Sequence, residues 1–158
     1  MDLHLDDLTI NISNINLADL RKSWDWLIAD MTAILMISKL GDMFLKGKDD
    51  AIYWLDTSSG ELMKVAGNSD EFDLALQDDD NIDNWFLPRL IEALEDSGQI
   101  LAKNQVYSFI KPPVIGGEYG AINLKTTDVS VHFAFTGQIL EQIKDLPNGT
   151  KVTIKLVD

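Results

Sequence analysis

The sequence contains no cysteine, and this single absence excludes three kinds of chemistry. Disulfide staples, thiolate nucleophiles and cysteine-ligated zinc all require this residue. The chain has 158 residues, and a domain of that size buries roughly 70% of its unfolded surface, so it can fold without staples. We therefore expect one ordinary domain with its own hydrophobic core.

Long apolar runs are missing as well. The longest, AILMI at residues 33–37, is far too short to cross a bilayer. The opening MDLHLDDLTI carries aspartates where a secretion signal would carry positive charge. We therefore expect a cytoplasmic protein without a membrane partner.

Recognisable catalytic spacing is also lacking. The two histidines, His4 and His132, lie near the terminus and inside an apolar segment, and a lone histidine in such a segment is typical of a core. The glycines of IGGEYG, residues 115–120, do not have the spacing of a phosphate-binding loop, and Glu118 would repel phosphate. We expect no catalytic residue and hence no enzyme, although a pair of carboxylates stays open on count alone.

A metal site is not expected either. The stretch DDDNIDN, residues 78–84, resembles the start of a calcium-binding loop. In that loop Asn84 would replace the glycine at position six, and Leu90 would replace the bidentate glutamate at position twelve. We therefore predict neither a metal nor a cofactor.

Positive charge is scarce. Lysine and arginine number 13 against 26 acids, which gives a net charge of −13. Phosphates require basic side chains, so a nucleic-acid partner is not expected. Solubility is the simplest explanation of an acidic surface, and a cationic partner is the sharper one. The distribution favours the second, because residues 70–96 hold ten acids against Arg89 alone.

Apolar residues alternate with a period of two after residue 33, which predicts short strands. The turn signals LGD, GKDD and TSSG separate these strands and are short enough to join antiparallel neighbours. We expect a meander of four strands, at residues 34–39, 42–46, 51–56 and 61–66. Further strands are expected at residues 8–13, 105–110, 121–126 and 151–157.

Helical periodicity predicts about four helices packed on this sheet. The first covers residues 16–31 with Asn16 as its N-cap, and the second covers residues 68–77. The third ends at Gly98 and begins either near Asp83 or around Leu87 with Pro88 in its first position. The fourth covers residues 128–145, although VSVHFAF at 129–135 also alternates like a strand.

These elements predict an α+β fold with a mainly antiparallel sheet, built from an N-terminal meander and C-terminal strands. We expect one domain over residues 1–158, in which residues 1–32 form an N-terminal extension and residues 33–158 form the core. Within it, Pro112 and Pro113 end a strand and Gly116-Gly117 reverses the chain. We therefore interpret PPVIGGEYG as a bend in the scaffold.

Three segments carry a resemblance to a known family. They are LGDMFLKGKDDAIYWLDTSSGELMKVAGNSDEFDLAL (40–76), QVYSFIKPPVIGGEYGAINL (105–124) and VHFAFTGQILEQIKDLPNGTKV (131–152). Over about residues 33–156 the chain resembles the C-terminal domain of bacterial type VI secretion immunity proteins, antidotes to a DNase effector. The resemblance implies a cytoplasmic protein that binds and neutralises a toxin without chemistry of its own.

The acidic run is the predicted partner surface. Aromatic residues beside carboxylates are typical of a hot spot for a basic protein, although the same aromatics could instead anchor the core. An acidic protein can mimic the charge of nucleic acid and occlude the basic cleft of a nuclease. An adaptor domain that binds another partner is the alternative interpretation. The predicted contact residues are Asp78, Asp79, Asp80, Asp83 and Trp85, with Glu118 and Tyr119 as minor candidates.

Overall fold

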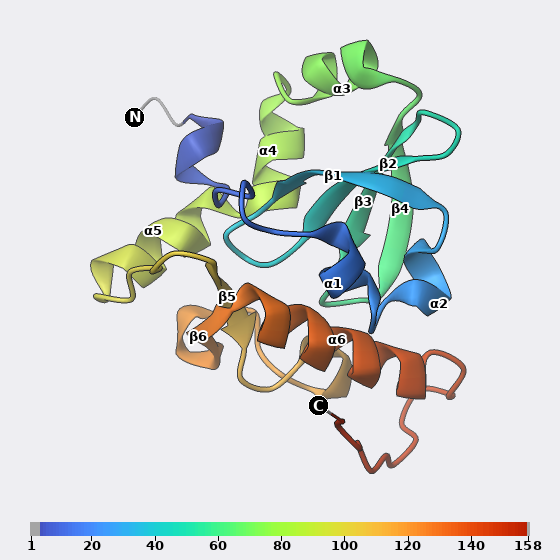
Figure 1. Ribbon diagram of the computed structural model, residues 1–158. Helices are drawn as coiled ribbons and strands as arrows, with labels where there is room; N and C mark the ends of the chain where they lie inside the picture. The colour runs from blue at the N-terminus through green and yellow to red at the C-terminus, as the bar shows by residue number, and fades with distance from the viewer. Residues whose placement is uncertain (1–3, 158) are drawn as a thin grey trace.

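Four antiparallel strands in sequence order form the central sheet of the computed structural model, which describes residues 4–157 (Figure 1). The meander and the α+β class are therefore confirmed. The register pairs Phe44 with Trp54 in the middle of the sheet. The strands are β1 (Met31–Ile37), β2 (Met43–Gly47), β3 (Ile52–Asp56) and β4 (Glu61–Ala66).

Both faces of the two central strands are covered, which explains why β2 and β3 are apolar almost throughout, whereas the edge strand β4 is largely exposed. Neighbouring side chains of a strand point to opposite faces. Met43 and Leu45 enter a core shared with the C-terminal helix, whereas Phe44 between them enters a second core. An antiparallel sheet with one wet face would alternate apolar and polar residues, and β2 does not.

Helices cover the two faces in separate groups. One face carries α1 (Leu17–Arg21), α2 (Asp25–Ile28) and the long α6 (Val129–Ile143), drawn in blue and orange-red in Figure 1. The other face carries α3 (Ser69–Ala75) and α4 (Asp79–Phe86), drawn in green. The helical interpretation of residues 128–145 is thus confirmed, and the strand alternative for 129–135 is excluded.

The expected single helix over residues 16–31 is wrong, because the chain breaks into α1 and α2 and β1 already begins at Met31. The break turns Trp24 fully into the core. It also brings the backbone of Ser23 against α6, where a Cβ atom on Gly137 would lie 2.4 Å from the Ser23 carbonyl oxygen. Close backbone packing at this point therefore replaces the continuous helix.

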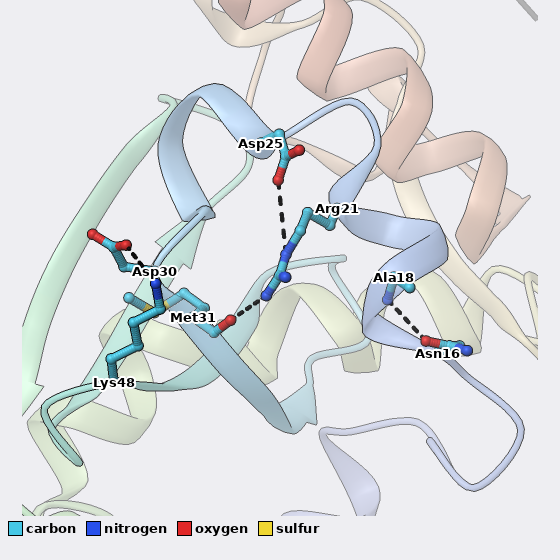
Figure 2. A network of polar contacts seen from close by, with 7 residues as sticks. All are labelled: Asn16, Ala18, Arg21, Asp25, Asp30, Met31 and Lys48. Atoms are coloured by element: carbon cyan, nitrogen blue, oxygen red, sulfur yellow. Dashed lines mark hydrogen bonds and ion pairs between the residues drawn. The ribbon is translucent and has the colours of Figure 1, made fainter.

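Polar contacts attach the two short helices to the sheet (Figure 2). Arg21 donates to the carbonyl oxygen of Met31 at the start of β1, and its Nε lies 3.8 Å from an Asp25 carboxylate oxygen. Asn16 accepts from the backbone N–H of Ala18 at 2.8 Å, which confirms it as the cap of α1. In the same view, Lys48 in the β2–β3 turn pairs with Asp30 at 3.3 Å.

The C-terminal strands form a separate ribbon of β5 (Gln105–Phe109) and β6 (Leu124–Asp128). The expected strand at 121–126 begins later, because residues 121–123 form a 3₁₀ turn, η3 (Ala121–Asn123). The ribbon meets the meander through one backbone hydrogen bond of 2.7 Å, from Tyr107 N–H to the Lys39 carbonyl oxygen. Helix α5 (Pro88–Asp96) packs against this ribbon.

The expected strand at residues 8–13 is also wrong. This segment makes a single bridge, between Thr9 and Ser38. The preceding residues form the 3₁₀ turn η1 (Leu5–Asp7), and Leu8 points into the core. The burial of Leu8 in the core, and not continued pairing with a neighbouring strand, fixes this segment.

The segment at residues 151–157 lies on α6 and does not form the expected closing strand. Gln142 donates to the carbonyl oxygen of Lys155 and accepts from its N–H, at 2.6 and 3.1 Å. Gln138 makes the same two bonds with Val157, at 2.9 and 2.6 Å. Side-chain amides one helical turn apart thus pair with alternate residues of an extended chain, as a neighbouring strand would.

Replacing Gln138 and Gln142 together by alanine is expected to release this tail. Four hydrogen bonds to its backbone are lost, while the core contacts of α6 remain. Hydrogen exchange should show the amides of Lys155 and Val157 exchanging at least about tenfold faster, since their N–H groups donate to these two side chains. Glu141→Ala, on the exposed surface of the same helix, is the matched control. Unchanged exchange in the double variant would contradict the assignment.

Candidate functional site

Helix α4 and its N-cap carry four of the ten acids found in residues 70–96, namely Asp78, Asp79, Asp80 and Asp83. Asp78 is its N-cap and accepts from the N–H of Asp80 at 2.9 Å, and acids in the first turn are stabilised by the helix dipole. Helix α4 begins at Asp79 and was not expected as a separate helix. The second expected start, around Leu87 with Pro88 in the first position, is confirmed by α5 (Pro88–Asp96). Leu87 adopts a left-handed conformation with φ of 47° and separates α4 from α5, whose first residue is Pro88.

A groove of about 650 Å³ opens where this helix junction faces one end of the central sheet. The sheet side comes from the residue before β2, from β3 and from the following turn. The helix side comes from the end of α4 and the start of α5. The lining residues are Asp42, Trp54, Asp56, Ser58, Asp83, Asn84, Trp85, Leu87, Pro88, Arg89, Leu90 and Tyr119.

Two tryptophans belong both to this lining and to the core beneath it. Trp85 packs edge-on against Phe44, with ring centroids 5.2 Å apart, and lies 6.5 Å from Trp54. Both indoles are more than nine-tenths buried. The indole N–H of Trp54 has no acceptor among residues 4–157. The groove therefore has aromatic walls that are anchored in the core.

Carboxylates approach the groove from both sides. Asp42 and Asp56 come from the same end of the sheet, because β2 and β3 pair Met43 with Leu55. Burial, and then the neighbouring Asp56, raise the pKa of Asp42 well above its usual value. Asp83 faces them from α4, and the basic side chain of Arg89 lines the same groove.

The bend at residues 112–120 brings Tyr119 to the rim of the groove. Gly116 has a φ of 100°, and a Cβ atom on Gly117 would lie 1.7 Å from the Lys111 carbonyl oxygen, so glycine is required at both positions. Tyr119 packs edge-on against Phe109, with centroids 5.0 Å apart, and its hydroxyl contacts that of Ser58. The tight bend therefore fixes where this ring lies.

The structure brings together three of the seven predicted contact residues. Asp83, Trp85 and Tyr119 line the groove. Asp78, Asp79 and Asp80 are exposed at the other end of α4, and Glu118 is exposed outside the lining. Sequence reasoning missed the sheet side, formed by Asp42, Trp54 and Asp56. The signal available for it was the Gly-Asp before β2 and the YWLD of β3.

His132 is a satisfied core residue. It is 2% exposed, its Nδ1 lies 2.7 Å from the Ser108 hydroxyl, and its Nε2 lies 2.9 Å from the Gly41 carbonyl oxygen. The Thr57 hydroxyl lies 3.2 Å from the same Nε2 and also donates to Asp42. This network joins α6, β5 and the sheet end that carries the groove. Burial lowers the pKa of His132 to about 4.

This low pKa predicts an acid-labile contribution to stability. His132 titrates at about 4 when folded and at its ordinary 6.5 when unfolded, so only the unfolded chain takes up the proton between these values. The stability is fully present above pH 6.5, decreases as the pH falls and is lost below about pH 4. The total is on the order of 3 kcal/mol for a shift of this size.

Urea unfolding at pH 7, 6, 5 and 4 measures this contribution when wild type is compared with His132→Gln. Glutamine keeps a donor near Gly41 but does not titrate, so the variant should lose less stability across this range. Asp42, which reaches the same Thr57, titrates in both proteins and cancels in the comparison. Identical pH slopes for the two proteins would contradict the prediction.

Two further features can be excluded within the described part of the chain. Residues 4–157 contain no group of three or more acidic or histidine side chains placed to hold a metal ion. No helix among those residues combines the length and the apolar character needed to span a membrane.

Comparison with known proteins identifies one family. Residues 66–140 match the family model of the C-terminal part of the T6SS immunity protein Tdi1, which confirms the resemblance over that range. The match begins at the last residue of β4 and ends within α6. It contains the helix side of the groove and the Tyr119 bend but not Asp42, Trp54 or Asp56. No curated protein matches the chain.

Proposed function

We propose that this protein is a non-catalytic immunity protein of a type VI secretion system. It binds a cognate secreted effector inside the producing cell and neutralises it by occlusion. The family match over residues 66–140 supports the immunity role. The acidity of the matched stretch supports a basic effector, such as a nuclease, as the partner.

The observation that carries the proposal is the arrangement of acids along α4. Asp78, Asp79 and Asp80 are exposed at its start, and Asp83 is exposed near its end beside the groove. Carboxylates along one helix offer a row of negative charge that can enter a cleft built for phosphates. A cleft filled in this way cannot hold nucleic acid.

Aromatic anchors complete the proposed contact surface. Trp85 is largely buried, but a small part of its side chain remains accessible in the groove. Tyr119 is 58% exposed at the rim. Rings of this kind carry much of the binding energy in protein interfaces, and surrounding acids contribute association rate and specificity. Glu118, next to Tyr119, is a peripheral contact.

The product of the adjacent gene provides the test. We expect it to be captured by this protein in a pull-down from purified components, and we expect co-expression to rescue the growth of cells that produce it. A neighbouring protein that is not toxic but still binds would instead favour the adaptor alternative. Toxicity that co-expression does not relieve would contradict the immunity role.

A further inference from the structure

We propose that the groove between α4–α5 and the end of β3 binds an arginine or lysine side chain carried by the protein partner. This inference rests on the proposed function, because it assigns one contact between the protein and its basic partner to a defined site. The groove, of about 650 Å³, is larger than one side chain and leaves room for the peptide backbone that carries it.

The walls of the groove suit the apolar stem and the charged head of such a residue. Leu87, Pro88 and Leu90 offer apolar surface to the methylene groups, which basic side chains bury while their charge stays in a polar environment. The rings of Trp85 and Tyr119 line the same space. A cation over an aromatic face is attracted by the ring, most strongly where water is excluded.

Two carboxylates stand on opposite sides of the space. Asp56 comes from β3 and Asp83 from α4, and the Asp42 carboxylate lies next to Asp56. Arg89 lines the groove too, but it takes part in none of the ion pairs formed among residues 4–157. Asp56 already accepts two hydrogen bonds from Ser58, and Asp42 accepts two from Thr57, in each case through Oδ1. None of the three carboxylates forms an ion pair among residues 4–157, so they remain open to an incoming cation, and Arg89 opposes its entry.

The indole N–H of Trp54 lacks an acceptor among the residues described, but so does that of Trp24 in the core on the other side of the sheet, and neither nitrogen is exposed, so these donors do not identify an occupant. Charge and shape indicate it instead. The carboxylates, the apolar walls and the room for a backbone suit a basic side chain that is carried by a peptide.

A blocked tetra-arginine peptide tests the site without any effector. The four tryptophans provide a built-in comparison in ¹H–¹⁵N spectra, because Trp54 and Trp85 line the groove while Trp24 and Trp26 pack on the opposite side of the sheet. Titration should shift the indole signals of the first pair and leave those of the second unchanged. Equal shifts in all four, or in none, would overturn the proposal.

Charge variants test where the peptide binds and whether the negative charge of the groove attracts it. Asp56→Asn with Asp83→Asn should weaken peptide binding by about tenfold, because two ion pairs are lost. Asp79→Asn with Asp80→Asn, an equal charge change at the far end of α4, should leave binding within about twofold. Arg89→Gln should tighten it by about threefold. Equal losses in the two aspartate pairs would show general charge attraction and overturn the groove.

Two further arms separate this inference from others. Spermidine at equal charge should shift the groove indoles less than the peptide does, and equal binding would identify a free polycation as the occupant and overturn the proposal. Since the peptide replaces the effector, its failure removes the groove site and leaves the immunity role standing. Failure of growth rescue removes the immunity role and leaves the peptide result intact.

Discussion

Replacing the four aspartates of α4 by lysine is expected to slow association with the effector by about ten- to a hundredfold at low salt. Each exchange changes the charge by two, so four exchanges take the net charge from −13 to −5. The variant also places positive charge where the wild type offers negative charge to a basic cleft. The residues exchanged are Asp78, Asp79, Asp80 and Asp83.

Salt dependence separates steering from contact. The wild-type association rate should fall steeply between about 0.05 and 0.5 M salt, because salt screens the attraction between the aspartates of α4 and a basic effector. The variant should show little dependence, and the two rates should converge at high salt. Stopped-flow or surface-based kinetics at several salt concentrations gives both slopes.

A second lysine variant with the same net charge is the control. Its exchanged acids lie across the sheet from α4, on α1, on α2 and at the end of α6, and all four are exposed: Asp19, Asp25, Glu141 and Asp145. This variant should keep most of the wild-type rate. If the two variants slow association equally, the effect comes from the net charge of the whole protein, and α4 has no special part in it.

The meander could be predicted because each of its strands is rich in apolar residues and each turn is short. LGD, GKDD and TSSG leave so few residues between strands that antiparallel pairing is the simple solution. The periodicity did not show that both faces of the sheet are buried. That follows from two groups of helices that lie far apart in the chain.

Sequence reasoning missed the elements whose conformation depends on tertiary contacts of side chains. The tail at 151–157 has the alternation of a strand, but it pairs with Gln138 and Gln142 of a helix. The helix expected at 16–31 breaks so that Trp24 can enter the core. In both places tertiary contacts outweigh local propensity, which a single sequence does not reveal.

The groove could be predicted on its helix side and at Tyr119, but not on its sheet side. The charge run identified Asp83 and Trp85, since composition alone makes that stretch unusual. Asp42 and Asp56 lie in ordinary strand-end positions, and only the pairing of β2 with β3 brings them together opposite α4. A site assembled from segments this far apart needs the fold before its members can be recognised.

Gly41→Ala is expected to destabilise the protein by about 3 kcal/mol or more, because the change acts on the backbone and on a buried network at once. Gly41 has a φ of 84°, which alanine adopts only with strain. An added Cβ atom would also lie 2.2 Å from Nε2 of His132, which hydrogen-bonds to the carbonyl oxygen of this same glycine. His132 would have to move, leaving its polar atoms unpaired.

Gly98→Ala separates the two causes. Gly98 has a φ of 94°, but no atom lies within 4 Å of a Cβ built there, so only the backbone strain of about 1 kcal/mol remains. The excess loss in Gly41→Ala, measured by urea unfolding at pH 7, therefore reports the contact with His132. Equal losses would show that the network adds nothing at this position.

Because Asp42 follows Gly41 directly and shares Thr57 with His132, the same variant should also weaken binding of the tetra-arginine peptide. His132 would then help to position Asp42 in the groove through Thr57, although it does not contact the partner.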